Sequence, residues 1–173
     1  MADERVRSEH ERQDFIGALA RHRGFLVQTV TGLSEEQARR HPTVSALSLG
    51  GLIKHVTRAE QNWTNFITQG TSAIGRTDAA SFAAHVASFD MADDETVSGL
   101  LERYAEVAQS TEALIMSLPS LEVAHPLPDA PWFEPGVSWT ARRALLHLIA
   151  EITQHAGHAD IIRESIDGAK SMG

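Results

Sequence analysis

The sequence predicts an all-α protein built as a four-helix bundle with long connections. Four long stretches carry apolar residues at helical spacing, and the alternation typical of strands is nearly absent. Two connections are too long to be simple turns, one over residues 71–93 and one over residues 126–136, and such loops in compact proteins are often functional. With 173 residues and 42 % hydrophobic side chains, we expect a single domain spanning residues 1–173.

The first half of the chain is expected to hold one long helix and one short one. An apolar stripe at helical spacing predicts the long helix over residues 9–31, where Gly32 can end it. Ser34 and Gln37 then have the spacing of a capping box, which predicts the start of a short helix.

Three further long helices follow from the same kinds of signal. Ser48 is a good N-cap for the second long helix, which we expect over residues 48–68. The long connection after it is expected to contain a helical turn at residues 81–87. The third and fourth long helices are predicted at residues 94–118 and 138–167, ending at a proline and a glycine, respectively.

Composition excludes several classes of protein. The formal net charge is −8, from 23 acidic and 15 basic residues, which argues against nucleic acid as the main partner because phosphate binding needs a concentrated basic surface. The sequence has no cysteine, so it has no disulfide or thiolate ligand, and a metal site must use His, Asp or Glu. The N-terminal segment does not look like a signal peptide, and no apolar run approaches the roughly 20 residues that span a bilayer. We therefore expect a cytoplasmic protein.

The predicted fourth helix carries an unusual cluster of ionisable residues. His147, Glu151, His155 and His158 fall within a sector of about 80° on a helix that turns about 100° per residue. This sector lies at or beside the apolar face, and burying such groups without partners is costly. Glu151 and His155 are one helical turn apart and can reach one cation. A salt bridge or a hydrogen-bonded core histidine is the common alternative for such a pair.

The predicted second helix supplies a third donor. His55 lies inside the apolar stripe of that helix, and metal sites in bundles are built from side chains on facing helices. His55, Glu151 and His155 would give three protein ligands and leave one coordination position open, as in catalytic sites. Imidazole and carboxylate suit zinc best, with nickel, iron and manganese as alternatives.

Other residues are candidates for supporting roles. His158 could be an acid–base group, a fourth ligand or a partner of a ligand, and it is the candidate catalytic residue. His147 is expected to support a ligand or the packing. Four aromatic residues are candidates to line a pocket: Trp63, Trp132, Phe133 and Trp139. Of these, Trp63 and Trp132 are the cofactor-binding candidates. Each of the four could instead be an ordinary core residue or anchor a loop.

Two segments, LGGLIKHVTRAEQNW at residues 49–63 and HLIAEITQHAGHADIIRESIDG at residues 147–168, resemble the DinB-like metalloproteins, a superfamily of four-helix proteins. The resemblance covers nearly the whole chain. It is strongest to an actinobacterial branch similar to the N-terminal domain of mycothiol-dependent maleylpyruvate isomerase. That isomerase uses His, Glu and His as metal ligands, whereas many DinB-like proteins use three histidines, and His55, Glu151 and His155 match the pattern of the isomerase.

The resemblance implies an up-down-down-up bundle, a divalent metal and a thiol-dependent transferase or isomerase. The implied partners are a small-molecule thiol such as mycothiol and an electrophilic substrate, with a homodimer as a further expectation. Arg143 stands where this branch usually has tryptophan, and Ala150 stands where a second glutamate is common. Because of these two differences, the resemblance does not define the substrate pocket.

Three alternatives to a thiol transferase stand. The protein could be a metal-dependent hydrolase in which the metal activates water. It could instead be a non-catalytic metal-binding or stress-response protein that needs the metal for its structure. In the third alternative no metal binds, and the histidines form a hydrogen-bonded polar cluster.

Overall fold

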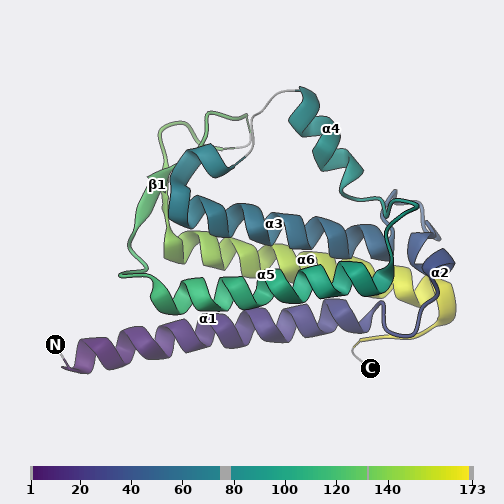
Figure 1. Cartoon of the computed structure of the whole chain (residues 1–173), viewed down its shortest axis with the longest axis horizontal. Helices are drawn as coiled ribbons and strands as arrows, with labels where there is room; N and C mark the ends of the chain where they lie inside the picture. Colours follow the sequence, from purple (N-terminus) through teal and green to yellow (C-terminus); the bar gives the residue numbers. More distant parts are fainter. Residues whose placement is uncertain (1, 75–78, 132, 172–173) are drawn as a thin grey trace.

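In the part of the chain that it describes, a computed structural model shows four long α-helices, two short α-helices, one 3-10 helix and a small strand pair (Figure 1). It describes residues 2–74, 79–131 and 133–171. The helices are α1 (Ala2–Gln28), α2 (Glu35–Arg39), α3 (Leu49–Gln69), the 3-10 helix η1 (Gly70–Ala73), α4 (Ala79–Ala87), α5 (Val97–Ser117) and α6 (Ala141–Asp167).

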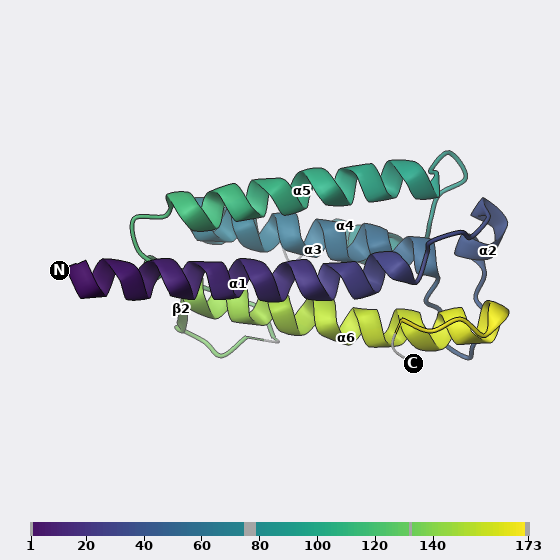
Figure 2. The same ribbon diagram turned by 90° about the horizontal axis from the view of Figure 1, so that it is seen from below.

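The four long helices form an up-down-down-up bundle, as the sequence predicts. α1 and α6 run in one direction, and α3 and α5 run in the other (Figures 1 and 2). α6 packs against both α1 and α3, and α3 also packs against α5. Fully buried apolar side chains from all four helices fill the space between them, among them Leu19, Leu26, Leu52, Phe66, Tyr104, Ile115, Leu145, Leu148 and Ile152.

Several helix ends differ from the expected ones. α1 begins at Ala2, well before the expected start at residue 9, and the chain leaves it after Gln28 through a short turn. α5 begins at Val97 because the side chain of Thr96 caps it by accepting a hydrogen bond from the amide of Gly99. Asp94 and Glu95, within the expected range of this helix, therefore lie before its start. The capping box of Ser34 and the N-cap Ser48 are both confirmed.

A two-stranded antiparallel sheet was not predicted. β1 (Ala124–Pro126) pairs with β2 (Ser138–Thr140), with His125 opposite Trp139. The expected start of the last helix at Ser138 is therefore wrong, because residues 138–140 are extended and Thr140 is the N-cap of α6. This pairing brings together the two ends of the proline-rich loop and fixes where α6 starts.

A buried polar network links α1, α3 and α5. The guanidinium of Arg23 donates to both carboxylate oxygens of Glu60 at 3.2 and 2.5 Å, and Thr111 donates to the same carboxylate at 2.6 Å. Arg23 also donates to Glu112, which is partly exposed. Glu60 itself is fully buried, so its charge depends on these partners.

Two glycines at the start of α3 allow the segment after α4 to lie directly on this helix. A Cβ added at Gly51 would lie 1.6 Å from the carbonyl oxygen of Phe89, and one at Gly50 would lie 2.5 Å from the sulfur of Met91. At residue 51 the approach is backbone to backbone, and only glycine fits there. As a result the chain at residues 89–91 lies against α3 one helical turn before His55.

Gly51→Ala is expected to lower the free energy of unfolding by about 1–3 kcal/mol, the usual cost of inserting a methyl group into a packed site. The added Cβ would push against the backbone of Phe89, which cannot move aside as a flexible side chain can. Urea unfolding followed by circular dichroism measures the change. Gly24→Ala in α1 is the matched control, because a Cβ there meets nothing within 4 Å. Equal stability of the two variants would contradict the close approach.

Candidate metal centre

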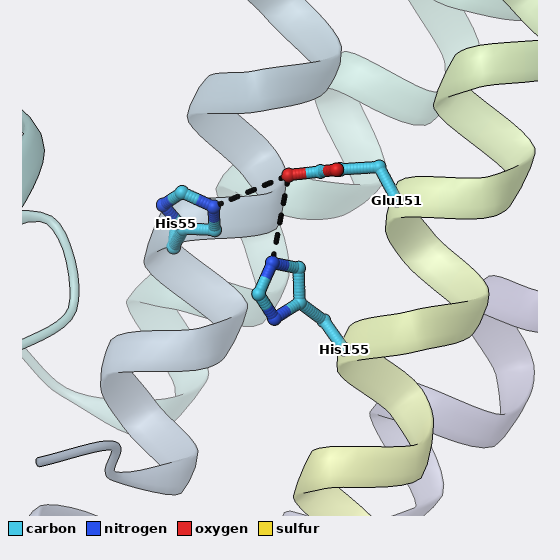
Figure 3. A group of neighbouring side chains, drawn as sticks. All are labelled: His55, Glu151 and His155. Carbon is cyan, nitrogen blue, oxygen red and sulfur yellow. Dashed lines mark ion pairs between the residues drawn. The ribbon is translucent and has the colours of Figure 1, made fainter. Parts of the chain in front are cut away.

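Two facing helices bring the three predicted ligands to a common point. His55 lies on α3, and Glu151 and His155 lie one turn apart on α6 (Figure 3). Oε1 of Glu151 lies 3.6 Å from Nε2 of His55 and 3.5 Å from Nε2 of His155. One ligand atom from each residue lies within 4.8 Å of the other two, so the three residues form a group that could hold a metal ion.

The surroundings of this group favour an ionised carboxylate. His55 is buried at 5 % exposure, while Glu151 and His155 are partly buried. Interactions with the side chains of His155 and His55 lower the pKa of Glu151 well below its usual range, against the opposing effect of burial. A negative carboxylate between two imidazoles is a donor set that a divalent cation would neutralise and bind.

The dimensions of the group fit a metal ion. Bonds of about 2.0–2.2 Å to imidazole nitrogen and carboxylate oxygen place two ligand atoms of a tetrahedral zinc about 3.3 Å apart. The two nitrogen–oxygen distances of 3.5 and 3.6 Å are close to this value. They are longer than a charge-assisted hydrogen bond of about 2.7–2.9 Å. Three protein donors would leave a further position for an exogenous ligand.

The other two histidines of α6 lie beside this group. The ring of His158 lies 5.5 Å from that of His155, and its Nδ1 is buried with no hydrogen-bond partner among the described residues. His158 is not in the group of candidate ligands found among those residues. His147 lies one turn before Glu151, and burial lowers the pKa of its imidazole. A neutral His147 fits a supporting role.

An aromatic cluster adjoins the group on the side of His147. The ring of Trp63 stacks on that of Trp139 at 5.0 Å and meets the ring of His147 at 4.7 Å. Phe133 touches both tryptophans, and Arg143 places its guanidinium 4.7 Å from the ring of Trp139. These side chains therefore form an aromatic wall beside His147, which lies one helical turn before Glu151. Trp132, the other predicted cofactor-binding residue, lies outside the described residues.

Sequence reasoning missed a set of residues at the end of α4. The ring of His85 lies 5.3 Å from that of His55, and burial, followed by the charge of His55, lowers the pKa of His85. The hydroxyl of Ser88 lies 3.0 Å from Nδ1 of His55, and the ring of Phe89 stacks on the imidazole at 3.9 Å. His85, Ser88 and Phe89 lie close together in the sequence at the end of α4. This spacing was only a weak signal of a site, because nothing in the sequence shows where α4 packs.

Comparison with solved structures supports the fold. A conserved protein from Enterococcus faecalis, known from its crystal structure, matches 91 % of this chain and 97 % of its own length with a TM-score of 0.64. The sequence identity is 15 %, so this similarity shows the fold alone. None of the curated proteins matches the chain. Among the described residues, no helix has the length and apolar character of a membrane span.

Comparison with protein families identifies the chain more closely. The family model described as mycothiol S-transferase matches residues 14–168, from the middle of α1 to the C-cap of α6. The match includes both helices that carry the candidate ligands and the whole of the bundle between them. The chain therefore belongs to the mycothiol S-transferase family of DinB-like four-helix proteins.

Proposed function

We propose that this protein binds a divalent metal ion through His55, Glu151 and His155 and acts as a metal-dependent transferase or isomerase that uses mycothiol or a similar small thiol. The observation that carries the proposal is the meeting of two imidazoles and a carboxylate from α3 and α6, with ligand atoms within 4.8 Å of one another. Family membership supports the thiol.

The chain itself would supply the ligands and the shape of the site. When bound, the metal would act as a Lewis acid that stabilises the thiol sulfur as thiolate, the better nucleophile. The protein has no cysteine, so the sulfur must come from a small molecule. Zinc suits a set of two imidazoles and one carboxylate, and nickel, iron or manganese could replace it.

The aromatic wall is the proposed binding surface for the reactants. Trp63 and Trp139 offer apolar faces beside His147, and Arg143 adds a positive charge at their edge. An electrophilic substrate with an anionic group would match this combination of ring faces and guanidinium. Trp63 is therefore proposed to contact the thiol cofactor or the substrate. The homodimer expected from the sequence stays a prediction.

The experiment is an assay of the zinc-loaded protein with mycothiol and an electrophile such as a haloarene or maleylpyruvate. We expect consumption of the thiol or isomerisation above the uncatalysed rate, and loss of that rate after chelation. Hydrolysis that needs the metal but no thiol would instead favour the hydrolase. If chelation unfolds the protein and no rate is found with any substrate, the metal is structural.

His158→Gln is expected to lower the turnover number by about 10²–10⁴-fold, the usual contribution of a general acid–base group. The imidazole would relay the thiol proton away from sulfur, and its ring lies 5.5 Å from that of His155. Zinc content, measured by elemental analysis, should stay at the wild-type value because His158 is not a ligand in this proposal. His85→Gln is the comparison variant. A loss of turnover in His85→Gln but not in His158→Gln would assign the acid–base role to His85 on α4 instead.

A further inference from the structure

The turn that follows α4 holds a serine in contact with the candidate ligand His55. Ser88 is buried, with 2 % of its surface exposed, and its Oγ lies 3.0 Å from Nδ1 of His55. The same hydroxyl donates to the backbone carbonyl of His85 at 2.6 Å. Ser88 thus connects the last turn of α4 to the imidazole on α3.

The direction of these hydrogen bonds fixes the tautomer of His55. A backbone carbonyl can only accept, so the one hydroxyl proton of Ser88 is used in the bond to His85. The oxygen of Ser88 must then accept from Nδ1 of His55, which carries a proton. In the neutral ring Nε2 is left with its lone pair, and Nε2 is the nitrogen that faces Glu151. This is the form that binds a metal.

The position of Ser88 is supported by contacts of the next residue, Phe89, with α3. The carbonyl oxygen of Phe89 approaches so close to α3 that only glycine fits at residue 51. The hydroxyl of Ser48 lies 3.4 Å from the same oxygen, and the ring of Phe89 stacks on His55 with an angle of 19° between the ring planes. These contacts hold residues 88 and 89 against the helix that carries His55.

The other candidate imidazole ligand has no comparable partner. Nδ1 of His155 is buried and makes no hydrogen bond within the described part of the chain. No protein group there therefore contacts Nδ1 of His155 through a hydrogen bond, whereas Ser88 contacts Nδ1 of His55. The hydroxyl of Ser88 accounts for this asymmetry.

We propose that Ser88 is a positioning residue of the metal centre: it holds His55 in the Nδ1-protonated tautomer and aims Nε2 at the point shared with Glu151 and His155. The inference rests on the proposed role of His55 as a ligand. Outer partners of ligating histidines fix ring orientation and basicity, and their loss typically weakens metal binding by about 10–100-fold. Ser88 would therefore influence the metal without touching it.

The first test reads the tautomer in the metal-free protein. Nitrogen-15 NMR of the imidazoles, with the His55 signals assigned from their loss in His55→Gln, should show a protonated Nδ1 and an unprotonated Nε2 in the neutral ring. Ser88→Ala should shift His55 toward the Nε2-protonated tautomer, and Ser88→Thr, which keeps the hydroxyl, should restore the wild-type pattern. An Nε2-protonated ring in the wild-type protein would overturn the proposal even if the alanine variant does not fold.

The second test measures zinc affinity by competition with a chromophoric chelator. Ser88→Ala should bind zinc about 10–100-fold more weakly than wild type, and Ser88→Thr close to wild type. Ser165→Ala is the matched control, because that hydroxyl also donates to a backbone carbonyl but lies on the exposed side of α6. Unchanged affinity in Ser88→Ala would refute the positioning role alone. Absence of zinc binding in the wild-type protein would refute the proposed metal function, and the positioning role with it.

Discussion

His155→Ala is expected to weaken zinc binding by more than about 100-fold, since the loss of a mere outer partner of a ligand already costs about 10–100-fold. The variant removes one of three donors, and the remaining pair, His55 and Glu151, comes from two different helices. His55→Ala should have an effect of the same size for the same reason. Isothermal titration or chelator competition measures the dissociation constants.

The control for these ligand variants is a histidine outside the site. His41→Ala removes a partly exposed imidazole that lies near Asp90, so it should leave zinc affinity unchanged. Glu151→Gln keeps the shape of the side chain but removes its charge, and it should also weaken binding. Equal zinc affinity for wild type, His55→Ala and His155→Ala would contradict the account, because binding would then take place elsewhere.

Glu60→Ala is expected to lower the free energy of unfolding by about 3–5 kcal/mol, the usual cost of removing one partner of a buried ion pair. The guanidinium of Arg23 would remain buried at 5 % exposure without the carboxylate that accepts two of its hydrogen bonds. Thr111 would lose its hydrogen bond to Glu60 and keep only the backbone carbonyl of Val107 as an acceptor. Urea unfolding followed by circular dichroism tests this expectation.

Glu112→Ala is the matched control for this network. Glu112 also accepts a hydrogen bond from Arg23, but 40 % of its side chain is exposed, and exposed pairs contribute about 0–1 kcal/mol. Glu112→Ala should therefore change stability little. A similarly small change in the free energy of unfolding for both variants would mean that water reaches Arg23 and that the network is not shielded from solvent.

The parts of the fold and site that could be predicted are those with a periodic signal. Helical spacing and caps such as Ser34 and Ser48 predict the long helices and the short α2. The same period puts Glu151 and His155 on one side of α6, and the apolar neighbours of His55 put it on the inner face of α3. Their roles as ligands stay a prediction.

The remaining features could not be predicted because they depend on contacts between distant parts of the chain. The strands at residues 124–126 and 138–140 are too short to show alternation, and each forms only because the other is present. The pairing of Arg23 with Glu60 spans 37 positions and leaves no pattern in either helix. Ser88 reaches His55 only because the chain after α4 turns back onto α3 at Gly51.

The central claim is that His55, Glu151 and His155 together hold one metal ion. The most direct measurement is X-ray absorption at the zinc edge of protein loaded with one zinc per chain, for wild type and His155→Ala. We predict a shell of nitrogen and oxygen atoms at about 2.0–2.1 Å with the outer scattering of two imidazoles, reduced to one imidazole or lost in the variant. A wild-type spectrum without imidazole scattering, or one that His155→Ala leaves unchanged, would contradict the claim.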